Sequence, residues 1–230
     1  MKRLLALAAL LLASTVSAEV REIKSMAALT PEVKPRTIVV FDIDNTLIEP
    51  LGNIGSDQWY EYLLKAYKRD ANLSDAEAEA KAVAAWTDAL GKVRVKPVET
   101  LTPPLVAALQ KDGIKVMALT ARGREYESAT LTQLKAVGID LSGILFAGEA
   151  DKGKVLAAFI KDLKLKPARV VFADDKPHHA RNVDAALTAS GIPVLSLRYG
   201  AADSKVDAFN QVMAEADTAG NAQLLFHGPR

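Results

Sequence analysis

The chain has 230 residues, 50% of them hydrophobic, and its 29 basic and 28 acidic residues give a net charge of +1 with neutral histidines. This balance gives no indication of a nucleic-acid or anionic-membrane partner, because either would favour a basic surplus. The absence of cysteine excludes disulfides and a lipid anchor on a lipoprotein cysteine.

The first 18 residues are typical of a secretory signal peptide. Lys2 and Arg3 precede an apolar run over residues 4–13, and small residues allow cleavage after Ala18. A membrane anchor is the alternative, but the run is shorter than the ~20 residues that a membrane-spanning helix needs. We therefore expect an exported protein, periplasmic or secreted. Its mature part has 27 basic and 28 acidic residues and no predicted integral membrane segment.

Five short apolar runs predict the strands of one parallel sheet. Residues 19–36 are predicted to form an extended lead-in, and the runs follow at residues 37–41, 114–119, 143–147, 169–173 and 193–197. Longer helical patterns separate the runs, and a last helix is predicted from about residue 203 to residue 215. Apolar strands that alternate with helices indicate a doubly wound α/β sheet covered on both faces.

The segment between the first two runs is too long for a simple crossover, because about 70 residues lie there. One helical pattern in it contains Trp59, and a second contains Trp86 and follows Ser74 and Glu77 at the spacing of a capping box. We predict a small helical cap at residues 50–98, inserted into a core formed by residues 19–49 and 99–230. Both tryptophans are expected in the core of the cap, since each lies in an apolar helical pattern.

Reactive side chains follow three of the predicted strands, and one more lies at a helix start. They are Asp42 and Asp44 after the first strand, Thr120 after the second, Lys152 at the start of the helix before the fourth, and Asp174 and Asp175 after the fourth. Because the carboxyl ends of parallel strands share one edge of the sheet, we expect these residues to converge there.

This set of residue types suits phosphate chemistry with a hard cation. Carboxylates are the ligands that magnesium prefers, and a hydroxyl and an ammonium can bind phosphate oxygens. One carboxylate can act as a nucleophile and a second can protonate the leaving oxygen. An EF-hand calcium loop is the alternative, but it needs Gly and Glu where a count from Asp42 finds Leu47 and Asn53.

The order and spacing of these residues resemble the haloacid dehalogenase (HAD) superfamily. Residues 42–46, with the sequence DIDNT, are similar to its first motif, and Thr120 in MALTAR is similar to its second. Lys152 or Lys154 resembles the third motif, and the two acids in VVFADD resemble the fourth. The sequences GSDQW and ADDKPHHARNV further resemble an exported bacterial HAD-like family known only as a domain of unknown function.

The resemblance implies a HAD-type Rossmann-like core, a Mg2+ cofactor and a small phosphorylated substrate. It implies that Asp42 is the nucleophile and a magnesium ligand. Asp44 would be the general acid and base, and its backbone carbonyl would bind magnesium. Asp174 would bind magnesium directly, and Asp175 would be a ligand or lie just outside the coordination shell.

The resemblance also implies that Thr120 and a lysine hold the phosphate. Lys152 fits the third motif better than Lys154, because K-G-x-x-L is a common form of that motif. The cap would close over the site and influence the choice of substrate.

Further polar side chains lie near these motifs, namely Arg122 and Arg124, His178 and His179, and Arg198 and Tyr199. An arginine there could meet a substrate anion, but a solvated or salt-bridged arginine is the simpler interpretation. Solvated histidines are the ordinary finding at a helix start.

These observations predict an exported, magnesium-dependent phosphatase that hydrolyses a small phosphate monoester through an aspartyl-phosphate. The alternative is a non-catalytic HAD-fold protein that binds an anion or a partner. Loss of Asp42 or Asp44 would favour that alternative, and the sequence contains both.

Overall fold

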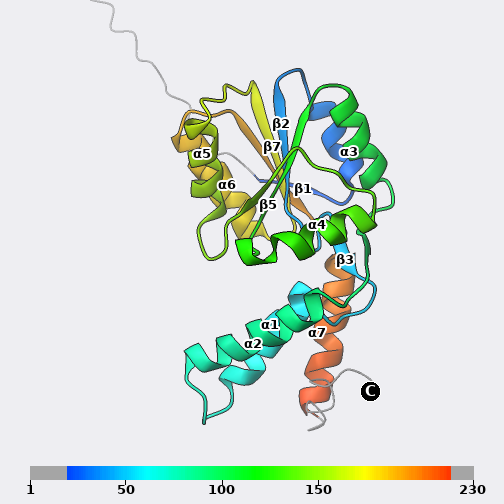
Figure 1. The fold of residues 1–230 in the computed structure, drawn as a ribbon, viewed down its shortest axis with the longest axis vertical. Helices are drawn as coiled ribbons and strands as arrows, with labels where there is room; N and C mark the ends of the chain where they lie inside the picture. Colours follow the sequence, from blue (N-terminus) through cyan, green and yellow to red (C-terminus); the bar gives the residue numbers. More distant parts are fainter. Residues whose placement is uncertain (1–19, 219–230) are drawn as a thin grey trace, which may run out of the picture.

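The computed structural model describes residues 20–218, so the predicted signal peptide at residues 1–18 lies outside the described residues. Figure 1 shows a sheet with helices on both of its faces and a smaller helical unit below it. The predicted doubly wound α/β fold with an inserted helical cap is confirmed.

Within residues 20–218, six parallel strands form the main sheet in the order β1-β8-β7-β2-β5-β6. They are β1 (Arg21–Ile23), β2 (Thr37–Phe41), β5 (Lys115–Thr120), β6 (Ile144–Phe146), β7 (Arg169–Asp174) and β8 (Val194–Tyr199). Five of these strands lie at the predicted apolar runs. β2 lies between β5 and β7, which brings the carboxyl ends of these three strands side by side.

The segment before β2 differs from the extended lead-in that the sequence predicts. β1 adds a strand at the sheet edge, where Glu22 pairs with Arg198 of β8, and a 3-10 helix, η1 (Met26–Glu32), follows it. Met26 and Leu29 are fully buried in the main core. A strand of three residues is too short to form a recognisable apolar run, and its pairing with β8 is a tertiary contact.

The side chains of β2 alternate between two cores. Val39 and Phe41 pack in the cluster that includes η1, α3 (Thr102–Lys111) and α4 (Glu127–Ala136). Ile38 and Val40 pack in the cluster that includes α5 (Lys152–Asp162) and α6 (Pro177–Ala189). Figure 1 shows α3 on one side of the sheet and α5 with α6 on the other. A strand covered on both faces has no solvent-facing position, which explains its continuous apolar run.

The helices α5 and α6 pack against each other at Gly153. A Cβ atom on this residue would lie 2.3 Å from the backbone oxygen of Asn182 and 2.8 Å from the Cβ atom of Ala186. The glycine therefore allows the close approach of α6 to the first turn of α5, which carries Lys152.

Substituting Gly153 with alanine is expected to destabilise the fold by about 1–3 kcal/mol, because the backbone of α6 has to move. Urea unfolding of the variant would measure this loss. Gly91→Ala is the matched control, since Gly91 ends a helix with φ of -76° and has nothing within 4 Å of the new Cβ atom. Equal stability of the two variants would contradict the close contact.

The insertion after β2 contains α1 (Asp57–Lys68) and α2 (Asp75–Leu90). It is bordered by β3 (Ile48–Pro50) and β4 (Val95–Pro97), which pair antiparallel. Ser56 caps α1, and Ser74 with Glu77 forms the predicted capping box of α2. These caps fix where the two helices of the cap begin.

The C-terminal helix α7 (Asp203–Thr218) packs against the inserted cap, as Figure 1 shows. Phe209 and Met213 are buried together with Trp59 and Tyr62 of α1. The Tyr62 hydroxyl donates a hydrogen bond of 2.9 Å to Asp217. The apolar core of the cap is therefore built by two inserted helices and by a third one from the end of the chain.

None of the helices described between residues 20 and 218 has the length and apolar character needed to cross a membrane.

Candidate active site

A tight turn after β2 sets the positions of Asp42 and Asp44. The Leu47 N–H donates to the Ile43 carbonyl at 2.9 Å, which reverses the chain directly after the two acids. Asn45 has a φ of 56°, a left-handed conformation that asparagine adopts more readily than most residues. The turn leaves Asp42 buried at the sheet edge and Asp44 partly exposed.

Lys152 connects the acids that follow two different strands. Its ammonium donates to Asp42 Oδ1 at 2.6 Å and to Asp174 Oδ2 at 2.8 Å, and all three side chains are buried. Asp151 caps α5 by accepting a hydrogen bond from the Lys154 N–H, so Lys152 is the first residue of the helix. Lys154 is exposed. The structure therefore brings Lys152, and not Lys154, to the acids.

Three carboxylates at this edge could hold a cation. Oxygen atoms of Asp42, Asp174 and Asp175 all lie within 4.8 Å of one another. The Asp175 N–H donates to the Thr46 hydroxyl at 3.1 Å, and Arg198 Nε donates to the Asp175 carbonyl at 2.9 Å, so the loop is held from both sides. Clustered carboxylate oxygens are the donors that a hard divalent cation such as magnesium prefers, and these residues fit it.

The close charges shift the pKa values of these acids. Burial raises the pKa of Asp42 to about 7, and nearby carboxylates add to the rise while Lys152 opposes it. Burial also acts on Asp174, but Lys152 and His179 outweigh it and lower its pKa to about 2. Burial and the two neighbouring acids raise the pKa of Asp175. A single buried ammonium does not balance three carboxylates, so additional positive charge would be favourable here.

Thr120 ends β5, the strand beside β2, and it faces the same cavity as the acids. The cavity has a volume of about 50 Å³. It is lined by Asp42, Asp44, Asp57, Thr120, Ala121, Lys152, Asp175, Lys176 and His179. Of the six predicted site residues, five line this cavity, and the sixth, Asp174, contacts Lys152 behind it. The sequence prediction that these residues converge agrees with the placement of all six.

Arg122 forms a two-pronged salt bridge with Asp44. Its Nε donates to Asp44 Oδ2 at 2.8 Å, and its Nη2 donates to Asp44 Oδ1 at 2.7 Å. Arg122 is buried, so the interpretation as a salt-bridged arginine agrees with the structure. Arg124 is exposed and lies 3.7 Å from Glu127. The sequence analysis gave no indication that Arg122 pairs with Asp44, 78 positions earlier.

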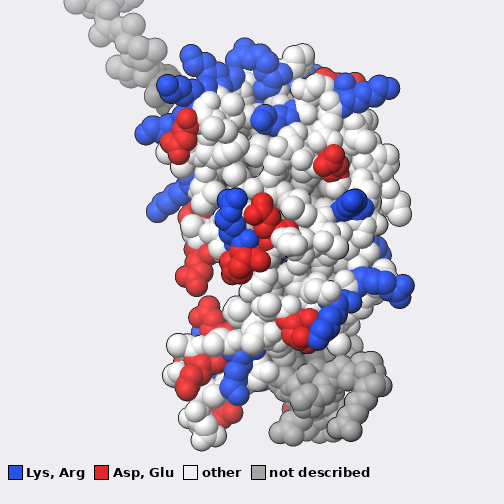
Figure 2. Space-filling model, viewed as in Figure 1, with Lys and Arg blue, Asp and Glu red and all other residues white. Residues whose placement is uncertain are grey.

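The cap reaches the cavity through Asp57, the first residue of α1. The Lys176 ammonium lies 2.6 Å from Asp57 Oδ2 and also contacts Glu61, so the loop after β7 is joined to the cap. Figure 2 shows acidic side chains gathered beside a basic one where the core meets the cap. Asp57 and Lys176 were not predicted as site residues, although both lie in the stretches that carry the family resemblance.

Three of the remaining candidates near the motifs, His179, Arg198 and Tyr199, lie close to acidic side chains, whereas His178 is exposed. His179 Nδ1 lies 3.3 Å from Asp174 Oδ2. Arg198 forms a salt bridge with Asp203 at 2.6 Å, and the buried Tyr199 donates from its hydroxyl to Glu99 at 2.6 Å. Of these residues, His179 lines the cavity, whereas Arg198 and Tyr199 do not.

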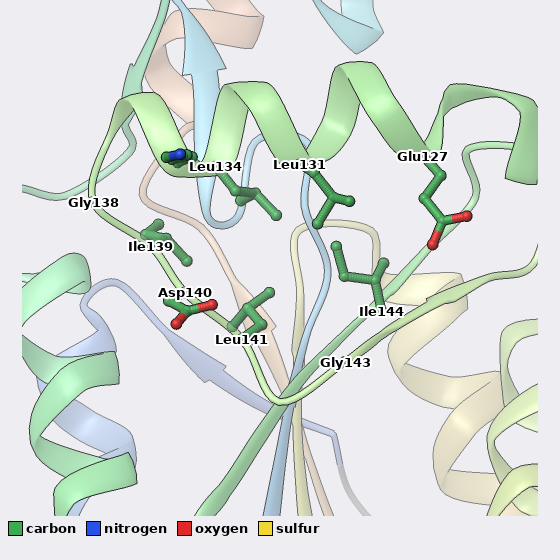
Figure 3. A pocket seen from close by; sticks show the side chains of 10 residues that line it. Glu127, Leu131, Leu134, Gly138, Ile139, Asp140, Leu141, Gly143 and Ile144 are labelled. Atoms are coloured by element: carbon green, nitrogen blue, oxygen red, sulfur yellow. The ribbon is translucent and has the colours of Figure 1, made fainter.

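A larger cavity of about 570 Å³ lies between α4 and β6, away from these acids. Figure 3 shows its wall of apolar side chains, among them Leu131, Leu134 and Ile144. It contains none of the predicted site residues. The smaller acidic cavity is therefore the candidate active site.

The fold is similar to that of solved HAD-like hydrolases, which confirms the predicted resemblance at the level of the fold. A haloacid dehalogenase-like family hydrolase from Streptococcus pneumoniae superposes with a TM-score of 0.50 at 18% identity, over 70% of this chain and 83% of that one. The class C acid phosphatase from Bacillus anthracis gives a TM-score of 0.40 at 14% identity, over 80% and 82% of the two chains.

The chain belongs to the family described as "Protein of unknown function (DUF2608)", whose model matches residues 17–143 and 141–224. Relatives carry the name "Putative outer membrane protein". The one from Chlamydia pneumoniae is 23% identical over 207 residues, which cover 82% of this chain and 79% of the relative. The one from Chlamydia trachomatis is 23% identical over 180 residues, which cover 71% and 69%.

Proposed function

We propose that this protein is an exported, magnesium-dependent phosphatase that hydrolyses a small phosphate monoester. The observation that carries the proposal is the buried Lys152 ammonium, which joins Asp42 at 2.6 Å to Asp174 at 2.8 Å beside a third carboxylate. Asp42 and Asp174 are buried and Asp175 is partly buried, and ionisable groups with shifted pKa values of this kind cluster at functional sites. Export is supported by the predicted signal peptide and by the names of the chlamydial relatives.

The reaction would take place in two steps at Asp42. In the first step, an Asp42 carboxylate oxygen attacks phosphorus, the bond from phosphorus to the leaving oxygen breaks, and Asp44 gives its proton to that oxygen. In the second step, a water oxygen attacks the aspartyl-phosphate, its proton passes to Asp44, and the bond to Asp42 breaks. Two acids two positions apart therefore have separate tasks.

The other residues of the cavity would bind the phosphate and favour the charged nucleophile. The Thr120 hydroxyl and the Lys152 ammonium are donors for phosphate oxygens. Asp42, Asp174 and Asp175 would hold magnesium, which supplies positive charge that offsets the carboxylates and the phosphate. A positive charge there lowers the pKa of Asp42 and so favours the ionised nucleophile.

Hydrolysis of 4-nitrophenyl phosphate by the mature protein tests this proposal. We expect turnover with magnesium and none with a chelator. Turnover should fall at least about a hundredfold in Asp42→Ala, which lacks the nucleophile, and in Asp44→Ala, which lacks the base that activates water in the second step. Asp112→Ala, at an exposed position after α3, is the control. Magnesium binding without turnover of any phosphate ester would instead favour the non-catalytic binding protein.

A further inference from the structure

We propose that Arg122 positions the carboxylate of Asp44 for proton transfer and couples this position to the cap through Gln133. The inference rests on the proposed phosphatase function. It assigns a role in the site to two residues, Arg122 and Gln133, that do not touch the phosphate in the reaction as proposed.

Arg122 and Asp44 form a pair with a fixed geometry. Two hydrogen bonds of 2.8 and 2.7 Å connect one edge of the guanidinium to both oxygens of the carboxylate. Such a fork fixes the plane of the carboxylate as well as its distance, which a single contact would not do. The Arg122 side chain is only 3% exposed and the Asp44 side chain 19%, so the orientation is set inside the protein.

The guanidinium is also held by α4, through the nitrogen that does not contact Asp44. Its Nη1 donates to the Thr130 hydroxyl and to Gln133 Oε1, both at 2.9 Å and both on α4. Its backbone N–H donates to the Thr120 hydroxyl at 3.1 Å. Arg122 is thus occupied by protein partners, and it is not available as the substrate-binding arginine that the sequence left open.

Gln133 connects Arg122 to the cap. The Gln133 amide nitrogen donates at 3.0 Å to the carbonyl of Leu90, the last residue of the cap helix α2. Trp86, one turn earlier on α2, places its ring 5.6 Å from the guanidinium carbon of Arg122. Gln133 therefore contacts Arg122 with one end of its amide and the cap with the other. A displacement of α2 acts on the same guanidinium that holds Asp44.

The consequence concerns the departure of the leaving group. Protonation requires an oxygen of Asp44 to point at the leaving oxygen while Asp42 attacks phosphorus. Arg122 occupies one lone pair on each oxygen of Asp44 and so determines which lone pairs are left to carry the proton that is transferred. A misplaced Asp44 slows the release of a basic leaving group and has little effect on one that departs without a proton.

A comparison of two aryl phosphates tests the role of Arg122. 4-Nitrophenolate leaves without a proton, whereas phenolate is more basic and needs one. For Arg122→Lys, which keeps the charge and loses the fork, we expect kcat/KM for phenyl phosphate to fall about 10- to 100-fold. For 4-nitrophenyl phosphate we expect a fall of less than about threefold, because the acid contributes little there. The exposed Arg124→Lys is the matched control and should leave both values unchanged.

Gln133→Glu tests the connection to the cap. Glutamate keeps an acceptor for Arg122 but cannot donate to the Leu90 carbonyl, so the contact with α2 is lost; it also adds a negative charge beside the guanidinium. We expect a smaller loss than in Arg122→Lys that is again confined to phenyl phosphate. Unchanged kinetics for both esters in Gln133→Glu would overturn the coupling to the cap.

Two other outcomes overturn the inference in distinguishable ways. An equal loss with both esters in Arg122→Lys, at wild-type melting temperature, would show that Arg122 acts on substrate binding and not on proton transfer. A wild-type protein with magnesium that hydrolyses neither ester would overturn the proposed function, and the inference with it.

Discussion

Replacing Lys152 by methionine is expected to abolish phosphate-ester hydrolysis and, in the presence of a chelator, to lower the free energy of unfolding by about 3–5 kcal/mol. Methionine has nearly the length of lysine but no charge, so the variant leaves the carboxylates of Asp42 and Asp174 buried without a cation. The Lys152 side chain is only 2% exposed, and solvent cannot replace the lost ammonium.

Urea unfolding with chelator and turnover of 4-nitrophenyl phosphate with magnesium would measure the two effects. The chelator matters because a bound cation would take over part of the role of the ammonium. Lys154→Met is the matched control: it lies two positions later on the same helix, its side chain is exposed, and it should behave as wild type. Similar losses in both variants would contradict the structure, which buries Lys152 and exposes Lys154.

The strand ends of the core could be predicted from the sequence because each contains its own local signal. The run that begins at Thr37 is apolar from residue 38 to residue 41, since β2 is covered on both faces, and the first acid follows it directly. The rule that parallel strands end at one edge then places Asp42, Thr120 and Asp174 together. This placement can be predicted without knowledge of any side-chain contact.

The sequence did not reveal the features that depend on distant contacts. β1 forms by backbone pairing with β8, in which Glu22 lies opposite Arg198. A three-residue strand has no recognisable sequence pattern of its own. The spacing of Phe209 and Met213 indicates an apolar face on the last helix, but not that this face meets the cap. The paired hydrogen bonds between Arg122 and Asp44 also depend on a distant contact, because they require the turn after β2 and the loop after β5 to lie side by side.

The choice between Lys152 and Lys154 also depended on local geometry that the sequence leaves open. Both lysines lie in the first turn of α5. The cap at Asp151 fixes where the helix begins, and Gly153 allows α5 to approach α6 closely. Together these two features turn Lys152 toward the sheet edge and leave Lys154 in solvent.

Substituting Asp42 with asparagine is expected to lower turnover by at least about a thousandfold. The same substitution is not expected to destabilise the metal-free protein near neutral pH. Asparagine has the shape of aspartate but cannot form the aspartyl-phosphate. Its neutral amide also removes a negative charge from a site where one ammonium faces three carboxylates, and Lys152 keeps Asp174 as its partner.

The pH dependence of the folding stability determines whether Asp42→Asn stabilises or destabilises the protein. The folded protein holds the pKa of Asp42 at about 7, above the ordinary aspartate value of 3.8, so the folded state binds this proton more tightly than the unfolded state. Stability from this group is therefore complete below about pH 3.8 and is lost as the pH rises toward 7. In chelator, wild-type stability should decline over that range relative to Asp42→Asn, and the variant should be at least as stable at pH 7.

Magnesium should reverse the order of stability of the two proteins. At a concentration a hundredfold above its dissociation constant, a ligand that binds only the folded state adds about 2.7 kcal/mol to the free energy of unfolding. We expect this gain in wild type and in the exposed control Asp112→Asn, and little of it in Asp42→Asn, which lacks one of the three carboxylates. Unfolding curves with and without magnesium measure the difference. A full magnesium gain in Asp42→Asn would place the cation elsewhere, since a site that tolerates loss of this carboxylate is not the one at the end of β2.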